Sequence, residues 1–292
     1  LIYKYSFSYA FNNKYIWNYN PLKEKKEYEF GGYATNYDSK TLNDIVNDTI
    51  FWKADIPPFL PPLEQSVTEV EVISKIFNSR KWTGKQTTLA NFKENAHKSD
   101  ILHLSLHSLL ASKSSEQNAM IFQKTGANKD YILKSLDLIG LRLNNSLSVL
   151  SSCYTSDGKV ISGEGMKSLA RNFSLSGSPA IVASQWQAYE GQTMMVLIKF
   201  YENLKKGYSK DIALQKAQIE YLEKSKGIYL APSNWANLIL IGDTSSIDFD
   251  NESFFVSNTF LISIIIFSIL MFIFSFYMFL KKEYKYWKKK SA

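Results

Sequence analysis

The hydrophobic positions along the chain change period several times, from short apolar runs to stripes with helical spacing. Runs typical of strands lie at 1–10, 28–34, 100–108, 147–153, 178–186 and 235–242. Stripes typical of helices lie at 63–77, 88–96, 132–139, 166–175, 193–206 and 209–222. Strands that alternate with helices form a parallel sheet covered on both faces. We therefore predict an α/β fold with a mostly parallel sheet between helices.

Turn and cap residues set the expected limits of these elements. The pair Gly31 and Gly32 is expected to break the second strand, because glycine weakens regular strand pairing. Residues 109–131 are polar and punctuated by glycine, which predicts a loop or a hairpin beside the sheet. Thr88 and Ser209 stand at the start of helical stripes and are predicted to cap those helices.

Near its carboxyl end the chain contains a long apolar run without charged residues. Residues 259–280 carry no charged side chain and are mostly Ile, Leu, Phe and Met, and a run of ~20 apolar residues spans a bilayer. A buried core helix is the alternative, but it would contain polar interruptions and would not end at a cluster of lysines. We predict a folded domain at 1–247, a polar linker at 248–258, a transmembrane helix at 259–280 and a basic tail at 281–292.

Charge is concentrated at the same end of the chain. The formal net charge is +7, and the tail 281–292 supplies +5 of it through six lysines and one glutamate, which leaves +2 for the rest. This balance excludes a nucleic-acid-binding surface on the domain. The positive-inside rule places the tail in the cytoplasm and the domain in the periplasm or outside the cell. Since the sequence opens in strand-like residues without methionine or signal peptide, we expect it to be the carboxyl-terminal part of a longer protein.

The reactive groups follow two of the predicted strands. Cys153, the single cysteine, ends the run that begins at Leu147, and the turn signal Thr-Ser-Asp-Gly comes next. His107 ends the run that begins at Asp100. If the two strands are parallel neighbours, the thiol and the imidazole meet above the edge of the sheet. A thiol needs such a base or cation beside it to become a nucleophilic thiolate.

The same residues have plainer interpretations. A lone cysteine is usually a small buried apolar side chain, and a histidine in mid-strand, such as His103, is usually a core residue with satisfied nitrogens. Ligand-spaced cysteines are absent, which disfavours a zinc site, and no Gly-x-Ser-x-Gly elbow or P-loop occurs. One cysteine also excludes an internal disulfide. Asp157, in the turn after Cys153, is a candidate for a substrate contact, although most acidic loop residues are merely solvated.

Several segments in order form a pattern that one protein family shares. They are Leu-Pro-Pro-Leu at 60–63, Glu-Val-Glu-Val-Ile at 69–73, Asp-Ile-Leu-His-Leu-Ser-Leu-His at 100–107, Leu-Ser-Ser-Cys-Tyr-Thr at 150–155, and the segments 163–173, 183–186, 200–207 and 235–242. The pattern resembles the CHAT peptidases, relatives of caspases and separase, over residues 1–247. The arrangement of a domain followed by a carboxyl-terminal transmembrane span is similar to that of CHAT proteins of Bacteroidetes-type bacteria. Those proteins often carry tetratricopeptide-like repeats upstream.

The resemblance implies a caspase-like α/β fold and a cysteine endopeptidase. In that family the residues at these positions would make Cys153 the nucleophile and His107 the general base and acid. The backbone N–H groups of Ser108 and Cys153 would form the oxyanion hole. Trp186 and Glu190 stand where separase-like relatives place a tryptophan and an acidic residue of the pocket for the P1 side chain. A carboxylate there implies a preference for Arg or Lys at P1.

The chain departs from the family pattern near this pair. Ser108 follows the histidine where the family usually has glycine, so a side chain crowds the approach. Tyr154 follows the cysteine where a polar residue is common, and Ser156 replaces a common glycine. A second hypothesis therefore stays open, a catalytically inactive domain that acts as a signalling or scaffold module. Under the first hypothesis the partners are a protein or peptide substrate and the bilayer around 259–280, and no metal or organic cofactor is needed.

Overall fold

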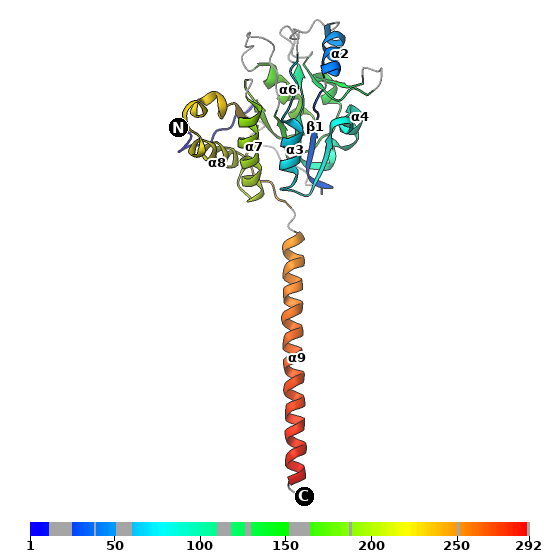
Figure 1. The fold of residues 1–292 in the computed structure, drawn as a ribbon, viewed down its shortest axis with the longest axis vertical. Helices are drawn as coiled ribbons and strands as arrows, with labels where there is room; N and C mark the ends of the chain where they lie inside the picture. The colour runs from blue at the N-terminus through cyan, green and yellow to red at the C-terminus, as the bar shows by residue number, and fades with distance from the viewer. Residues whose placement is uncertain are drawn as a thin grey trace. The chain divides into compact units, whose positions relative to one another are not determined.

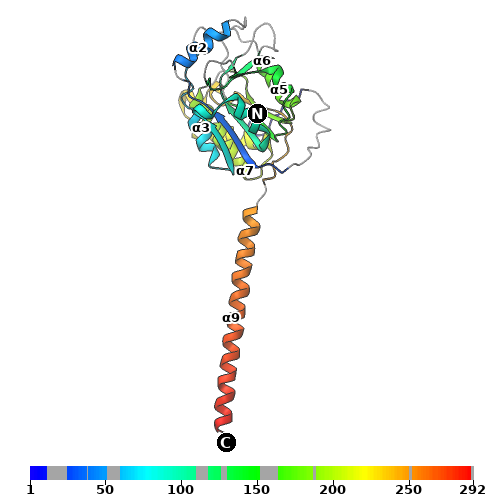
Figure 2. The ribbon, with the colours of Figure 1, turned by 90° about the vertical axis from the view of Figure 1, so that its right-hand side faces the viewer.

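The computed structural model describes residues 1–11, 25–37, 39–50, 60–109, 118–125, 130–151, 164–186, 189–249 and 252–290. The chain divides into two compact units, Leu1–Ile247 and Asp248–Ala292. The first unit is a sheet between layers of helices, and the second is a long helix (Figures 1 and 2).

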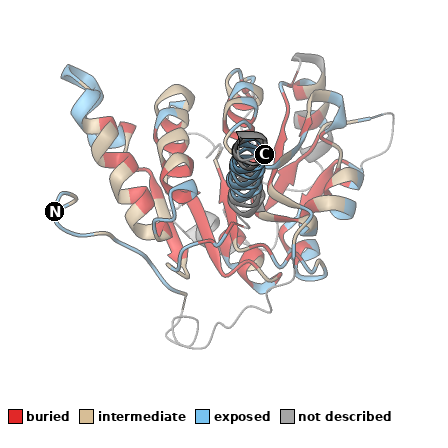
Figure 3. Cartoon of the chain, turned by 90° about the horizontal axis from the view of Figure 1, so that it is seen from below, coloured by how far each residue is buried: buried red, intermediate tan, exposed pale blue. Residues whose placement is uncertain are grey.

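A six-stranded sheet forms the centre of the first unit, in the order β2-β1-β3-β7-β8-β9. The strands are β1 (Tyr28–Ala34), β2 (Ser79–Thr83), β3 (Ser99–Ser105), β7 (Leu147–Leu150), β8 (Ala180–Ser184) and β9 (Leu238–Gly242). All run parallel except β9, which is antiparallel to β8. Apart from the edge strand β2, the strands lie largely buried between the helices (Figure 3), which explains why most of them read as continuous apolar runs. The predicted α/β fold with a mostly parallel sheet between helices is confirmed.

Helices cover both faces of this sheet. The helices are α2 (Ser39–Ile50), α3 (Ser66–Ser74), α4 (Leu89–Asn95), α5 (Ser135–Ile139), α6 (Glu164–Leu175), α7 (Glu190–Lys205) and α8 (Lys210–Lys224). α3, α7 and α8 pack side by side over one face, while α4, α5 and α6 share a core on the other. Side chains of β3 alternate between the two layers: Leu102 and Leu104 join the core of α4 to α6, and His103 faces α3 and α7.

A small antiparallel sheet lies beside the main one, as predicted for residues 109–131. It consists of β4 (Ser108–Leu109), β5 (Ala119–Ile121) and β6 (Ile132–Lys134). The prediction of a helix over 132–139 is wrong in its first part, because β6 pairs with β5 before α5 begins. Three residues of strand are too short to show a period of their own.

The expected break at Gly31 and Gly32 does not occur, and β1 is continuous. A Cβ at Gly32 would lie 2.7 Å from Val70 of α3, and one at Gly31 would lie 2.6 Å from the Ser99 hydroxyl oxygen. The two glycines therefore let α3 and β3 approach the backbone of β1 closely.

The expected opening strand at 1–10 is also wrong. Only Tyr9 pairs, through one parallel bridge to Ile241 at the edge of the sheet. Tyr3, Tyr5 and Phe7 are exposed, so the alternation in this segment does not reflect one buried face.

The two predicted caps differ in outcome. Thr88 caps α4 as expected, since its side chain accepts from the Asn91 N–H at 3.1 Å. Ser209 stands at the start of α8 but makes no cap hydrogen bond; its hydroxyl instead donates to the Asp211 carboxylate at 2.7 Å. An acidic side chain in the first turn competes for the hydroxyl there.

The second unit is helix α9 (Glu252–Lys290). Its segment Ile262–Lys282 has a mean hydropathy of 2.5 and is wholly exposed, and by length and composition it could cross a membrane. The helix begins at Glu252, inside the stretch expected to be a linker, and it continues through most of the lysine tail.

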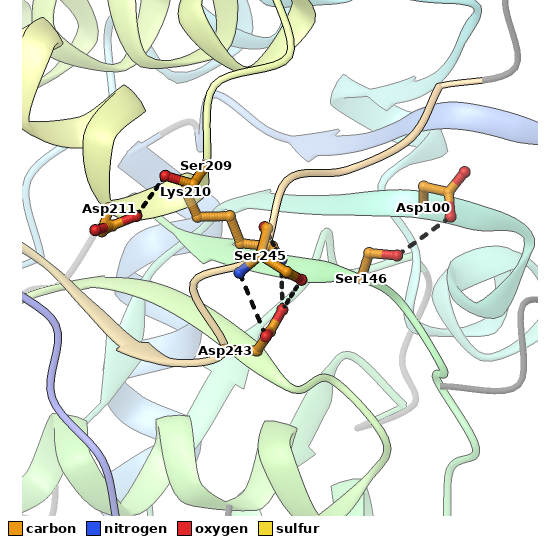
Figure 4. Close-up of polar contacts among 7 residues, drawn as sticks. All are labelled: Asp100, Ser146, Ser209, Lys210, Asp211, Asp243 and Ser245. Carbon is orange, nitrogen blue, oxygen red and sulfur yellow. Dashed lines mark hydrogen bonds and ion pairs between the residues drawn. The ribbon is translucent and has the colours of Figure 1, made fainter. Parts of the chain in front are cut away.

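A buried ion pair holds the chain where it leaves β9 (Figure 4). Lys210 is only 1% exposed. Its ammonium group donates to Asp243 Oδ2 and to the Ser245 carbonyl, both at 2.7 Å. Burial alone would raise the pKa of Asp243, but hydrogen bonds from Lys210 and the Ser245 hydroxyl outweigh it and hold that pKa below its usual value. Because β9 is antiparallel, this contact lies at the amino edge of the parallel strands.

Candidate active site

His107 lies just beyond β3, at the carboxyl edge of the central sheet. Its N–H donates to the Tyr37 hydroxyl at 3.4 Å, and its carbonyl accepts from the Ile121 N–H at 2.9 Å. Its imidazole packs on the Tyr37 ring, with ring centroids 4.8 Å apart. Tyr37 and Ile121 therefore fix both the backbone and the ring plane of His107.

One backbone carbonyl orients the imidazole. Nε2 of His107 lies 2.9 Å from the Pro61 oxygen, and because a carbonyl can only accept, we assign the ring proton to Nε2. Nδ1 is then the basic nitrogen of the neutral ring. Burial lowers the pKa of His107 to about 4, against an opposing effect of the Pro61 hydrogen bond. His107 is therefore neutral at pH 7 and able to take up a proton.

The structure places β3 and β7 as parallel neighbours, which is what the pairing of His107 with Cys153 requires. Leu104 pairs with Leu150, and the N–H of the following residue, Ser151, donates to the Leu104 carbonyl at 3.1 Å. Cys153 and Asp157 themselves lie outside the described residues.

Ser108 opens β4 and pairs with Met120 of β5. In an antiparallel ladder, hydrogen-bonded and non-bonded pairs alternate. Because Ile121 bonds to the carbonyl of His107, the adjacent pair of Ser108 and Met120 is of the non-bonded type. The N–H of Ser108 therefore points away from β5, and its side chain is fully buried.

Glu190 is the first residue of α7, and its Oε2 accepts from the Gln65 N–H at 2.8 Å. Burial raises the pKa of this half-buried carboxyl; the Gln65 hydrogen bond opposes the shift, and the charges of Glu69 and Glu64 add to it. The carboxylate therefore sits in a negative environment in which a cation would be stabilised.

Trp186 lies just beyond the carboxyl end of β8 and is partly exposed. Its indole N–H donates to the Ser233 carbonyl at 3.3 Å, and its own carbonyl accepts from the Ser184 hydroxyl at 2.6 Å. The predicted pocket residue is therefore fixed at the same edge of the sheet as His107.

The segment 61–65 connects two of the candidate residues. Pro61 contacts His107 and Gln65 contacts Glu190, so one short stretch before α3 holds both. Sequence analysis missed this segment and Tyr37 as parts of the site. Its sequence signals were the pair of prolines, which makes the stretch extended, and the match of residues 60–63 to the family pattern.

A second group of polar contacts surrounds His103. Its Nδ1 lies 2.7 Å from the Tyr201 hydroxyl and its Nε2 lies 2.9 Å from Glu69 Oε1, so the prediction of a satisfied core histidine is confirmed. Within the described part of the chain, no group of three His, Cys, Asp or Glu side chains could hold a metal ion.

Comparison with known proteins identifies the family. A model of the CHAT domain matches residues 17–243. The chain belongs to the CHAT family. Tetratricopeptide repeat protein 28 of Mus musculus is 32% identical over 114 residues, which cover 39% of this chain and 4% of that protein.

Two solved structures are similar to this CHAT domain at low identity. The crystal structure of the Arg-specific cysteine proteinase gingipain R is 13% identical, with a TM-score of 0.47, over 78% of this chain and 49% of that chain. A complex of Porphyromonas gingivalis RgpB pro- and mature domains is 13% identical, with a TM-score of 0.43, over 78% and 50% of the two chains. The chain thus spans about half the length of these proteins and a small part of the mouse protein.

Proposed function

We propose that this CHAT domain is a cysteine endopeptidase in which Cys153 is the nucleophile and His107 the base. The observation that carries the proposal is the state of His107: it is buried, neutral and oriented by Pro61, on the strand next to the one that leads to Cys153. In the sequence, His107 comes three residues after Leu104 and Cys153 comes three residues after Leu150, and Leu104 and Leu150 pair in the sheet.

The reaction follows from these roles. The Cys153 thiol gives its proton to Nδ1 of His107, and the sulfur attacks the scissile carbonyl carbon. The carbon–nitrogen bond breaks, and the amine leaves with the proton from His107. Water, deprotonated by His107, then hydrolyses the thioester and returns the free thiol. The N–H groups of Ser108 and Cys153 would hold the oxyanion, each worth about 3 kcal/mol. The cycle uses no metal or organic cofactor.

The proposed substrate is a protein with Arg or Lys at P1. Glu190 supports this, because its half-buried carboxylate lies near the charges of Glu69 and Glu64, and a cationic side chain would offset that accumulation. Trp186 would form a wall of the same pocket, and Asp157 would contact substrate from the loop after Cys153.

We propose that residues 259–280 of α9 anchor the protein in a membrane, and that the polar stretch 248–258, in which α9 already begins at Glu252, connects the anchor to the domain. The basic tail 281–292 would lie in the cytoplasm and the domain 1–247 in the periplasm or outside the cell, in a single-pass arrangement. An upstream tetratricopeptide-like region is proposed as well, and the name of the mouse relative, a tetratricopeptide repeat protein, supports it.

The second candidate is a catalytically silent scaffold of the same fold. The side chain of Ser108 favours it, because it is fully buried directly after His107, where the family usually has glycine. A scaffold needs neither an approach for substrate nor a reactive thiol.

Covalent labelling separates the two candidates. The full chain would be treated with a peptidyl acyloxymethyl ketone bearing Arg at P1, with a P1 Asp probe for comparison, and the modified residue identified by mass spectrometry. We expect modification of Cys153 that is lost in His107→Ala and kept in His97→Ala, a change at an exposed histidine. Labelling of Cys153 that is unchanged in His107→Ala would contradict the peptidase proposal and favour the scaffold. The absence of labelling at Cys153 in the full-length protein, with its proposed upstream region, would do the same.

A further inference from the structure

Glu69 is a buried carboxylate on the side of the sheet that α3 and α7 cover. It lies in the first turn of α3 and is only 4% exposed. A buried charge is costly unless hydrogen bonds and charge partners compensate it. The groups that contact this carboxylate are therefore held tightly in place.

Its oxygen Oε1 contacts two side chains, His103 of β3 and Ser151, which follows β7; Ser151 in turn contacts Ser105 of β3. His103 Nε2 lies 2.9 Å from Oε1, and the Ser151 hydroxyl bonds to the same oxygen. The hydroxyl oxygens of Ser151 and Ser105 lie 3.1 Å apart. Since a carboxylate only accepts, the Ser151 hydroxyl donates to Glu69, and the Ser105 hydroxyl oxygen lies within reach as a second acceptor for the same proton.

The two serines mark the ends of the strands that carry the proposed catalytic pair. Ser105 closes β3 two residues before His107, and Ser151 follows β7 two residues before Cys153. We infer that Glu69 is a positioning residue, whose carboxylate fixes the ends of β3 and β7 relative to each other and so sets the distance between base and nucleophile. This inference rests on the proposed function for its catalytic meaning, but its structural content can be measured independently.

The rest of the cluster keeps the carboxylate aimed at the serines. The Tyr201 hydroxyl of α7 lies 2.7 Å from Nδ1 of His103, so both ring nitrogens are engaged and the imidazole is fixed. His103 and Ser151 therefore contact the same oxygen of Glu69, and the His103 contact is fixed by Tyr201. The chain of contacts runs from α7 through β3 and α3 to the end of β7.

The test is Ser151→Ala in the full chain, since it removes the link to β7 and leaves the contact between Glu69 and His103 in place. Ser148→Ala is the matched control: Ser148 is a buried serine of β7 whose hydroxyl lies 2.6 Å from the hydroxyl of Ser178, away from the proposed pair. Ser151→Thr, which restores a hydroxyl, is the rescue variant. The readouts are kinact and KI of the P1 Arg acyloxymethyl ketone, amide hydrogen exchange over 99–108 and 147–153, and melting temperature.

We expect kinact of Ser151→Ala to fall about tenfold with KI unchanged. A small displacement of His107 relative to Cys153 would lower the rate of the chemical step much more than the affinity for the probe. Amide exchange should become faster at the ends of both strands, and Ser151→Thr should restore both values. Ser148→Ala should lower the melting temperature to a similar extent but keep kinact within about twofold of the wild type, since its hydroxyl does not bridge β3 and β7.

Two results would overturn the inference: unchanged amide exchange over 99–108 in Ser151→Ala, or an equal loss of kinact in Ser148→Ala. Failure of the proposed function looks different, because wild-type Cys153 would then react no faster than Cys153 of His107→Ala. In that case the exchange experiment alone decides whether Glu69 and Ser151 fix the two strand ends.

Discussion

The two edges of the central sheet both bury polar groups, yet they treat charge in opposite ways. At the amino edge, Lys210 is buried as an ion and is matched by Asp243 and the Ser245 carbonyl at 2.7 Å. At the carboxyl edge, His107 is buried without becoming an ion at pH 7, because burial lowers its pKa to about 4. A matched buried charge holds the chain in place, whereas a neutral base retains the capacity to take up a proton. The same sheet thus has a buried ion pair at one edge and a buried neutral histidine at the other.

The largest expected effect comes from removing the base. His107→Ala should lower kcat/KM for a P1 Arg peptide about 10⁴-fold, because the proton acceptor of the attacking thiol is lost. The measurement is hydrolysis of a fluorogenic peptide, with His97→Ala as the control. Residual activity above about a tenth of wild type would contradict a catalytic role for His107.

Breaking the ion pair at the other edge should affect stability and leave the chemistry alone. Lys210→Met leaves the Asp243 carboxylate without its cation and should lower the free energy of unfolding by about 3 kcal/mol. Urea unfolding in detergent micelles measures this, and Lys206→Met, at an exposed lysine close by in the chain, should change it little. The rate of Cys153 labelling in the cold should match wild type; a large loss would show that the two edges are coupled.

The pH dependence of stability should report the buried neutral histidine. Because the folded pKa of His107 lies below its ordinary 6.5, the unfolded chain binds a proton between pH 6.5 and 4 that the folded chain does not. Stability is therefore full above pH 6.5 and falls as the pH is lowered, by roughly 2 kcal/mol between pH 6.5 and 5. Unfolding measured at both pH values should show this fall in wild type and in His97→Gln. If the free energy of unfolding fell by the same amount in His107→Gln, the pH dependence would come from titratable groups other than His107.

The smallest expected effect tests the charge of Glu190 at the carboxyl edge of the sheet. Glu190→Gln keeps an acceptor for the Gln65 N–H but removes the negative charge, so kcat/KM for P1 Arg should fall about tenfold. A P1 norleucine substrate should be cleaved equally by both proteins. Glu202→Gln, elsewhere on α7 where Glu202 pairs with Lys199, is the matched control. An equal loss for both substrates would make Glu190 a support for Gln65 and α3 rather than a specificity residue.

The fold was predictable wherever burial on both faces produced a continuous apolar run. β3, β7 and β8 are of this kind, and so their parallel pairing followed from the pattern. β2 was missed because Ser79–Thr83 lies at the sheet edge and Trp82 is its only buried residue. The N-terminal segment failed in the opposite direction: alternating aromatics suggested a strand, although only Tyr9 finds a pairing partner.

The residues of the candidate site could be predicted where the residue type, its place at the end of an apolar run or the family pattern singled them out. His107 could be singled out because it follows an apolar run, and Glu190 and Trp186 by resemblance to the family. The Pro61 carbonyl and the Tyr37 hydroxyl could not, because they reach His107 only through tertiary contacts and one of them is a backbone group. The predicted roles of His107, Cys153, Glu190, Trp186 and Asp157, and of the Ser108 N–H, all stay predictions.

The contacts that hold His107 also have a consequence for the timing of folding. They join His107 to Pro61 and Tyr37 across 46 and 70 residues of chain. Contacts between residues so far apart require loop closure and form slowly. In a chain with the proposed activity, the base is therefore oriented only after the sheet has assembled, and a protein still being synthesised is protected from attack by its own active site.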